Sequence, residues 1–387
     1  MKRVLLLSCG TGQGHHSCAL AIKEYFETQN ISCEFLDALD FISKRFTGFI
    51  AWGHSFIYRY LPGLFRQGYA FSEAHSGVFQ EGSAVYQIMA SGADSLFQHI
   101  TAGQFDTVIC THMFAAIMLT HCMKEHPLSV RTAFVATDYT CYPGLDACKL
   151  HHYFIADDGL AGYFIQSGAS PASVTASGIP IRQSFWSQIE KKYAKEQLGI
   201  DPSHKHLLVM GGSMGAGPMI RLLKSISRLL DNDAEVSVLC GTNWELRQCL
   251  ALRYRQEKRI HIRGYTDQVS LYLSSADLYL TKPGGISITE AAAKCVPVAF
   301  VNAVAGCELY NMDYFVSMGA AISAASPVEL AERTICLLQS PAQRHQMENA
   351  LREHRQANGA IRIFQELNRN VCGEEHEYRG LPSVQAS

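Results

Sequence analysis

The sequence His206-Leu207-Leu208-Val209-Met210 runs directly into Gly211-Gly212-Ser213-Met214-Gly215-Ala216-Gly217. An apolar run of this length is typical of a buried strand, and the glycines after it allow a tight turn into a helix, which we predict near residues 219–230. The same succession occurs near the start of the chain, with a strand at 4–8 and a turn at 9–15 before a helical pattern. Two such units predict an α/β protein with doubly wound parallel sheets.

Other short apolar runs place the remaining strands of these sheets. We predict them at residues 32–36, 107–111, 133–137, 153–156, 236–240, 260–263, 278–281 and 298–301. A chain of 387 residues is long enough for two domains. Gly178 and Pro180 interrupt the pattern between the two halves. We therefore predict domains at 1–180 and 181–350, a C-terminal helix at 351–372 that crosses back to the first domain, and a flexible tail at 373–387.

Composition limits the classes of function. The net charge of −2 gives no overall attraction to nucleic acid. The 13 cysteines are scattered without Cys-x-x-Cys spacing, so we expect reduced thiols in a cytoplasmic protein and no metal site. The first apolar run, 4–7, is shorter than the core of a signal peptide, and no run approaches the length of a membrane-spanning helix.

A second glycine turn lies in the same predicted domain as Gly211–Gly217. The predicted strand 278–281 runs into Lys282-Pro283-Gly284-Gly285, and a helix follows through Thr289 and Glu290. Free N–H groups at a helix start attract phosphate, and two such starts can bind one pyrophosphate without a metal. Glu290 is placed to accept hydrogen bonds from a ribose, while Glu308 and Asn311 follow the strand 298–301 at the same sheet edge.

The first turn admits a different interpretation. It reads Gly12-x-Gly14-x-x-Ser17, and Asp37 ends the next strand where a dinucleotide-binding protein has its ribose-binding acid. The third glycine is replaced by serine, so the pattern is a weak signal for NAD. An NAD-dependent oxidoreductase remains a distant alternative.

The segment 46–71 is rich in aromatic and basic residues. Such a mixture is typical of a membrane interface, although a helix pair packed on the sheet accounts for it equally well. If it touches lipid, we expect the contacts to come from Trp52, Phe56, Arg59 and Arg66.

Taken together, these motifs resemble the processive diacylglycerol glucosyltransferases and monogalactosyldiacylglycerol synthases, which are related to the peptidoglycan glycosyltransferase MurG. The resemblance covers nearly the whole chain. It rests on the following pieces in this order: Gly12-Gln13-Gly14-His15, Thr137-Asp138-Tyr139, Ser177-Gly178-Ile179-Pro180-Ile181-Arg182, Gly211-Gly212-Ser213-Met214-Gly215, Gly264-Tyr265, Thr281-Lys282-Pro283-Gly284-Gly285, Thr289-Glu290-Ala291, and Glu308 with Asn311.

The resemblance implies a GT-B fold, in which two Rossmann-like domains face a cleft, and an inverting transfer from a UDP-sugar to a lipid at the membrane surface. It implies that Glu290 meets ribose, that the backbone near Tyr265 meets uracil, and that Glu308 and Asn311 meet the sugar. The donor-binding set that it implies is Gly14, Gly212, Ser213, Met214, Gly215, Tyr265, Lys282, Pro283, Gly284, Gly285, Thr289, Glu290, Glu308 and Asn311. The implied partners are the UDP-sugar, a lipid acceptor and the inner face of the cell membrane, with no further cofactor.

The attacking hydroxyl must lose a proton, and His15 and Asp138 are both candidates for the base. In the family the Thr-Asp pair is usually followed by histidine and tryptophan, whereas this chain continues Tyr139-Thr140-Cys141-Tyr142. The acceptor therefore stays open between diacylglycerol and a lipid-linked cell-wall precursor or other molecule. A regulator that binds a UDP-sugar without turnover is the non-enzymatic alternative.

Overall fold

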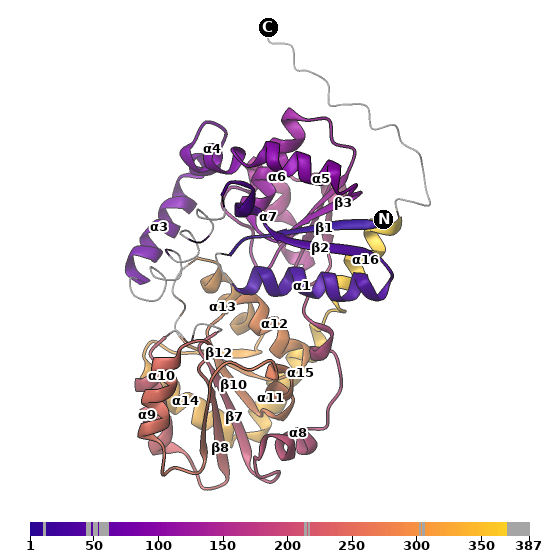
Figure 1. The fold of residues 1–387 in the computed structure, drawn as a ribbon. Coiled ribbons are helices and arrows are strands. Elements are labelled where there is room, and N and C mark those ends of the chain that lie inside the picture. Colours follow the sequence, from indigo (N-terminus) through magenta and orange to yellow (C-terminus); the bar gives the residue numbers. More distant parts are fainter. Residues whose placement is uncertain are drawn as a thin grey trace.

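The computed structural model describes residues 1–10, 13–43, 48, 53, 62–212, 215, 217–301, 303 and 306–369. It consists of two α/β domains, one above the other (Figure 1). Within the described residues, no helix combines the length and the apolar character needed to cross a membrane.

The first domain is built on a six-stranded sheet in the order β2-β1-β3-β4-β5-β6, in which every pairing is parallel. Its strands are β1 (Arg3–Ser8), β2 (Ser32–Asp37), β3 (Thr107–Cys110), β4 (Arg131–Val135), β5 (His152–Ile155) and β6 (Val174–Ala176). Its helices are α1 (Gln13–Thr28), α3 (Pro62–Ala74), α4 (Ala84–Ala90), α5 (Ala93–Ala102), α6 (Met113–Glu125) and α7 (Ala161–Gln166).

The second domain has a six-stranded parallel sheet in the order β12-β11-β10-β7-β8-β9. Its strands are β7 (Lys205–Met210), β8 (Ala234–Leu239), β9 (Ile260–Arg263), β10 (Leu278–Thr281), β11 (Val298–Phe300) and β12 (Ala321–Ser323). The helices are α8 (Lys191–Leu198), α9 (Met219–Leu229), α10 (Trp244–Arg253), α11 (Val269–Ser275), α12 (Gly285–Ala293), α13 (Cys307–Ser317), α14 (Pro327–Gln339), α15 (Pro341–Glu353) and α16 (Gly359–Arg369).

Short 3-10 helices complete the two domains. They lie at Ala38–Phe41, Ser76–Phe79, Leu145–Ala147, Asp158–Leu160, Pro171–Ser173 and Gln183–Phe185.

These two sheets confirm the predicted doubly wound α/β fold. Every predicted strand is present within two residues of its expected bounds. Strands β6 and β12 were not predicted, because they have 3 residues each and are only partly buried, so they lack the apolar run that marks the equally short β11.

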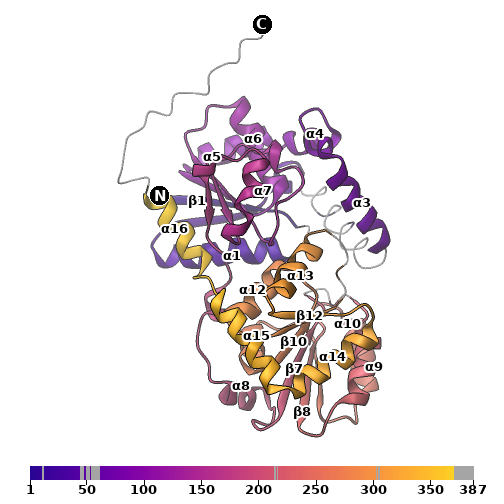
Figure 2. The ribbon, with the colours of Figure 1, turned by 180° about the vertical axis from the view of Figure 1, so that it is seen from behind.

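The C-terminal helices connect the domains. We predicted one helical stretch near the end of the chain, and the structure has two helices, α15 and α16, with a break at 354–358. Ser340 caps α15 by accepting a hydrogen bond from the Gln343 N–H, with Pro341 in the first turn. Helix α16 lies against α1 of the first domain, where Phe364 packs edge-on against Tyr25 and Phe26 (Figure 2).

Candidate functional site

A cleft of about 570 Å³ lies between the two domains and is lined by residues of both. It lies where strand order reverses in each sheet, between β1 and β3 in the first domain and between β7 and β10 in the second. Ligands of open α/β sheets bind at such switch points, because the loops on the two sides diverge and leave a crevice. The cleft is large enough for a nucleotide and its substituent.

The two glycine turns of the second domain follow the adjacent strands β7 and β10. Gly212 has a φ of +72°, and a Cβ there would lie 2.7 Å from Cε of Lys282. Gly215 has a φ of +57°, and a Cβ there would lie 2.4 Å from the carbonyl oxygen of Cys240. Both positions therefore need glycine for their backbone conformation, and Gly215 also needs it for space, because the neighbouring atom is backbone. Ser213 and Met214, predicted at the same turn, lie outside the described residues.

Lys282 supplies positive charge at this end of the cleft. Its Nζ lies 3.1 Å from Oε1 of Glu308, and both residues line the cleft. Helix α12 begins beside it at Gly285, so its first N–H groups and Lys282 favour an anion at the same place.

Glu290 and Tyr265 both line the cleft. The Tyr265 side chain is exposed, whereas burial raises the pKa of Glu290 from its ordinary 4.5 to about 8, against the opposing charge of Arg182. A carboxyl with that pKa is largely protonated in the empty cleft at neutral pH, where it can both donate and accept hydrogen bonds.

His15 faces the cleft from the first turn of α1. Its Nδ1 lies 2.8 Å from the carbonyl oxygen of Thr111 and 2.9 Å from Oγ1 of Thr137. A carbonyl only accepts, so Nδ1 carries the proton and Nε2 carries the lone pair. Burial lowers the pKa of His15, although the charge of Asp138 opposes that effect. The neutral imidazole is thus the favoured form.

Asp138 is surrounded by donors. Its Oδ2 accepts from the Tyr142 hydroxyl at 3.1 Å and from Thr137 Oγ1 at 3.3 Å. Its Oδ1 accepts from Nδ2 of Asn311 at 2.7 Å. Thr137 therefore joins His15 to Asp138 through one hydroxyl, and the carboxylate orients the group that orients the imidazole.

Three predicted donor-binding residues lie at the junction of the domains, and of these only Gly285 also lines the cleft. Asn311 is fully buried; its Oδ1 accepts from the Tyr139 N–H, and its Nδ2 also donates to the carbonyl of Pro283. Thr289 lies 3.0 Å from the Tyr139 hydroxyl. A Cβ on Gly285 would lie 2.0 Å from the Thr137 carbonyl oxygen, so this glycine permits the close approach of the two domains.

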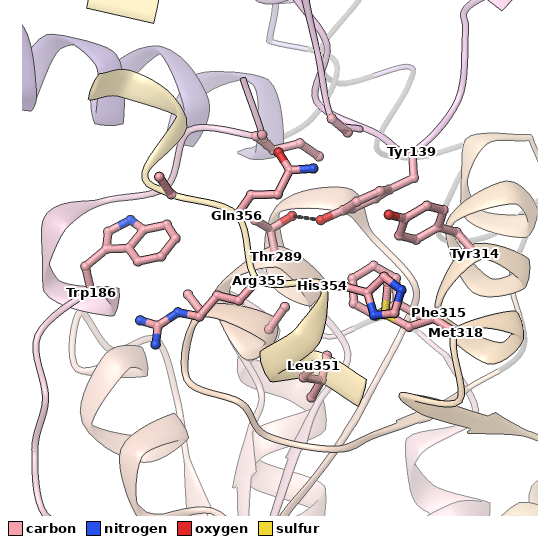
Figure 3. A pocket seen from close by; sticks show the side chains of 16 residues that line it. Tyr139, Trp186, Thr289, Tyr314, Phe315, Met318, Leu351, His354, Arg355 and Gln356 are labelled. Atoms are coloured by element: carbon pink, nitrogen blue, oxygen red, sulfur yellow. Dashed lines mark hydrogen bonds between the residues drawn. The ribbon is translucent and has the colours of Figure 1, made fainter. Parts of the chain in front are cut away.

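A smaller cavity is bounded by both domains and by the break between α15 and α16 (Figure 3). Tyr139, Trp186, Thr289, Tyr314 and Gln356 are among its lining residues. Its volume of about 40 Å³ suits only a few water molecules, so it is too small for a nucleotide.

Two other residues considered in the sequence, Asp37 and Arg66, are not among those that line the cleft. Asp37, considered above as a ribose ligand, accepts hydrogen bonds from the N–H groups of Gly10 and Leu39 and so holds its own turn. Arg66 is exposed on α3. Trp52, Phe56 and Arg59 lie outside the described residues. Among the described residues, no group of three or more His, Cys, Asp and Glu side chains is arranged to hold a metal.

Several residues that line the cleft were not predicted as site residues, among them Tyr142, His112 and Arg182. Tyr142 and His112 line it, and the His112 ring lies 4.6 Å from that of His15. Arg182, quoted above only as part of a motif, also lines it opposite Glu290. A signal existed for His112, which comes directly after the predicted strand 107–111, where side chains meet at the sheet edge.

Two protein-family models match the chain, one in each domain. The model described as monogalactosyldiacylglycerol (MGDG) synthase matches residues 15–181. The model of the glycosyltransferase family 28 C-terminal domain matches residues 206–363. Together they cover well over half of the chain.

A curated relative, the processive diacylglycerol beta-glucosyltransferase of Staphylococcus epidermidis, is 28% identical over 240 residues. The aligned region spans 62% of this chain and 60% of that relative, which is less than two thirds of its length.

Solved structures share the fold at low identity. MurG of Acinetobacter baumannii superposes with a TM-score of 0.62 at 14% identity, covering 95% of this chain and 100% of that one. The UDP-GlcNAc 2-epimerase of Neisseria meningitidis bound to UDP-GlcNAc gives 0.63 at 12% identity, covering 96% and 100%. The GT-B architecture and the resemblance drawn from the motifs are both confirmed, and this chain belongs to the glycosyltransferases that join an MGDG synthase domain to a family 28 C-terminal domain.

Proposed function

We propose that the chain is an inverting glycosyltransferase that transfers a hexose from a UDP-sugar to a membrane lipid, with diacylglycerol as the acceptor. The observation that supports it most directly is the placing of His15 on one wall of the cleft and Lys282 with the two glycine turns on the other. One wall offers a base and the other an anion site, which are the two groups that a displacement at a sugar carbon requires. The activity of the Staphylococcus epidermidis relative, a processive diacylglycerol beta-glucosyltransferase, favours diacylglycerol and glucose.

In this proposal His15 is the base. Its Nδ1–H is donated to Thr111, so Nε2 is free to take the proton of the acceptor hydroxyl as that oxygen attacks the anomeric carbon. Asp138 has both carboxylate oxygens engaged by donors and is better suited to orienting Thr137 and stabilising the imidazolium that forms. The bond from the anomeric carbon to the UDP oxygen breaks as the new glycosidic bond forms, which inverts the carbon.

The leaving UDP gains negative charge, and fixed positive groups stabilise it. We assign this role to Lys282, the start of α12 at Gly284 and Gly285, and the turn at Gly212 and Gly215. Ser213, Met214, Pro283 and Thr289 remain predictions of the family pattern. Glu290 is proposed for the ribose, Tyr265 for the base, and Glu308 for the sugar. Gly14 allows close approach on the opposite wall, where a Cβ would lie 3.3 Å from Ile286.

A lipid acceptor requires the enzyme to reach the bilayer. We propose peripheral binding at the cytoplasmic face of the cell membrane through the first domain. Helix α3 supports this proposal, because it exposes Leu64 and Phe71, with Arg66 exposed on the same helix. Contacts by Trp52, Phe56 and Arg59 remain predictions.

The decisive experiment measures UDP release from UDP-glucose, UDP-galactose and UDP-N-acetylglucosamine, each with and without vesicles that contain diacylglycerol. We expect release that needs UDP-glucose and diacylglycerol together, with a glycolipid as the product. Release that ignores diacylglycerol would contradict the acceptor assignment. Binding of UDP without release under any condition would contradict the assignment as an enzyme.

A further inference from the structure

Two helices of the second domain, α9 and α10, expose a surface that is both basic and apolar and has no role in the chemistry described above. The connections β7–α9–β8 and β8–α10–β9 advance in the same direction across the sheet, so right-handed crossovers place both helices on one face. The α9–α10 surface consists of exposed residues on these helices and the turn after α10: Ile220, Arg221, Lys224, Arg228, Leu229, Trp244, Arg247, Leu252, Arg253 and Arg255.

The charge of this surface differs from that of the whole protein. Segments 217–230 and 244–256 contain six arginine and lysine residues and one acidic residue, Glu245, whereas the net charge of the chain is −2. Arg221, Lys224 and Arg228 follow one another at spacings of three and four residues, so they share one face of α9. Among the described residues, none of the six cations forms an ion pair. Their charge is therefore available to an anionic partner.

Large apolar side chains are exposed on the same two helices. Trp244 is 62% exposed and Leu252 is 70% exposed, while Ile220 and Leu229 are each 41% exposed. A single exposed apolar residue needs no explanation. Tryptophan and leucine among unpaired arginines have the composition of a surface that binds at lipid headgroups, where rings enter the interface and cations meet phosphates.

The position of the α9–α10 surface in the molecule also favours binding at a lipid surface. In Figures 1 and 2 the helices α3, α9 and α10 lie along the same edge of the molecule, so one flat surface can touch both domains at once. Leu64 and Phe71 of α3 are 54% and 56% exposed on that edge. Helix α10 starts three residues after Gly241, which lines the cleft, so a bilayer held there lies close to the cleft.

We propose that the α9–α10 surface binds the surface of an anionic phospholipid bilayer, as a docking site on the second domain in addition to α3 of the first. The proposal rests on the lipid acceptor proposed above and extends it, because it attaches both domains to the membrane. With both attached, the cleft keeps its orientation to the bilayer while product leaves and the next acceptor enters.

The test is co-sedimentation of the full chain with vesicles of phosphatidylcholine alone and with vesicles that also contain phosphatidylglycerol. Replacing Arg221, Lys224 and Arg228 together by Ala is expected to weaken binding to the anionic vesicles by about 10- to 100-fold. The difference from the parent should shrink at high salt, because the attraction is screened. The double variant Trp244→Ser with Leu252→Ser is expected to weaken binding about tenfold, with less dependence on salt.

A matched control removes the same charge from the opposite edge of the molecule, at Lys192 of α8, Arg352 of α15 and Arg362 of α16 (Figure 1). This triple Ala variant is expected to bind vesicles like the parent. Parental binding by the Arg221/Lys224/Arg228 variant, or an equal loss in the control, would overturn the proposal.

Turnover of an acceptor dispersed in detergent is measured for the same variants. This measurement distinguishes a failure of the docking proposal from a failure of the proposed enzymatic activity. Selective loss of vesicle binding in a protein that shows no turnover would support the docking site and contradict the activity. Normal turnover, together with vesicle binding that is unchanged in both sets of variants, would support the enzymatic activity and contradict the docking site.

Discussion

Asn311 of α13 donates a hydrogen bond from Nδ2 to Oδ1 of Asp138 over 2.7 Å, and the two residues belong to different domains. The same amide accepts from the Tyr139 N–H at 2.7 Å through Oδ1. Approach of the second domain thus completes the set of donors around the carboxylate that orients Thr137 and His15.

Substitution of Asn311 tests its contact with Asp138. Asn311→Asp replaces the donor by a second carboxylate beside Asp138, and we expect kcat to fall about 100-fold while KM for the UDP-sugar changes by less than about threefold. The added negative charge also favours the protonated form of His15, so the acid limb of the pH profile should move to higher pH. Asn311→Leu is the comparison, since it removes the donor without adding charge. If instead KM for the sugar donor rose and kcat held, Asn311 would be a sugar ligand.

His15→Ala is expected to lower kcat by about 1,000-fold and to leave UDP affinity nearly unchanged, because the base is lost and the anion site is intact. Steady-state turnover assays measure kcat, and isothermal titration calorimetry measures the affinity for UDP. His16→Gln is the matched control, since His16 is the neighbouring residue, lies 3.8 Å from Asp37 and does not line the cleft.

The pH profile tests the same residue in the unmodified protein. Burial lowers the pKa of His15 below its ordinary 6.5, and a base works in its deprotonated form. We therefore expect the acid limb of kcat/KM to have its midpoint below pH 6.5. A midpoint above 6.5 would contradict the assigned environment.

Gly285→Ala tests how closely the domains must approach. The new Cβ would meet the Thr137 carbonyl oxygen at 2.0 Å, so the domains must separate and Asn311 must lose Asp138. We expect turnover to fall by about 100-fold and small-angle scattering to report a larger radius of gyration. Gly162→Ala on α7, where a Cβ meets nothing within 4 Å, is expected to leave both unchanged.

The raised pKa of Glu290 predicts that the stability of the protein without ligand depends on pH. Its pKa rises from 4.5 to about 8 on folding, so the folded state holds a proton that the unfolded state releases between these values. Stability is therefore fully present below about pH 4.5 and is lost as the pH rises toward 8. Glu290→Gln should match the parent at pH 5 and exceed it at pH 8 by on the order of 2 kcal/mol in the free energy of unfolding. Denaturant unfolding at the two pH values provides the measurement, and an equal stability difference at both would contradict the buried carboxyl.

Much of the fold was predictable because its signals are local. Strands such as β7 and β10 are continuous apolar runs, and the glycines after them leave few alternatives to a turn. The predictions failed where local information is scarce: β6 and β12 are three residues long, and the break between α15 and α16 lies in a helical pattern that continues on both sides.

Some residues of the site were likewise predictable from local sequence signals, and others were not. Lys282, Glu290 and His15 were predictable because each lies next to a glycine turn or near the start of the helix after it. Asn311 was predicted as a sugar ligand by position in a motif, and in this structure it is fully buried between Asp138, Tyr139 and Pro283. Tyr142 gave no signal, because its hydroxyl acquires a role only when Thr137 and Asp138 fold against it.

The sequence by itself determined the two parallel sheets, the glycine turns at their edges and the family, because apolar periodicity and glycine spacing act over a few residues. Only the tertiary structure decided which distant groups meet at the site. Asp138 and Asn311 are 173 residues apart, and His15 and Thr137 are 122 apart. The contact of Asp138 with Asn311 depends on how the two domains close on each other, and that of His15 with Thr137 depends on how the first sheet brings its strand ends together. No local pattern encodes either geometry.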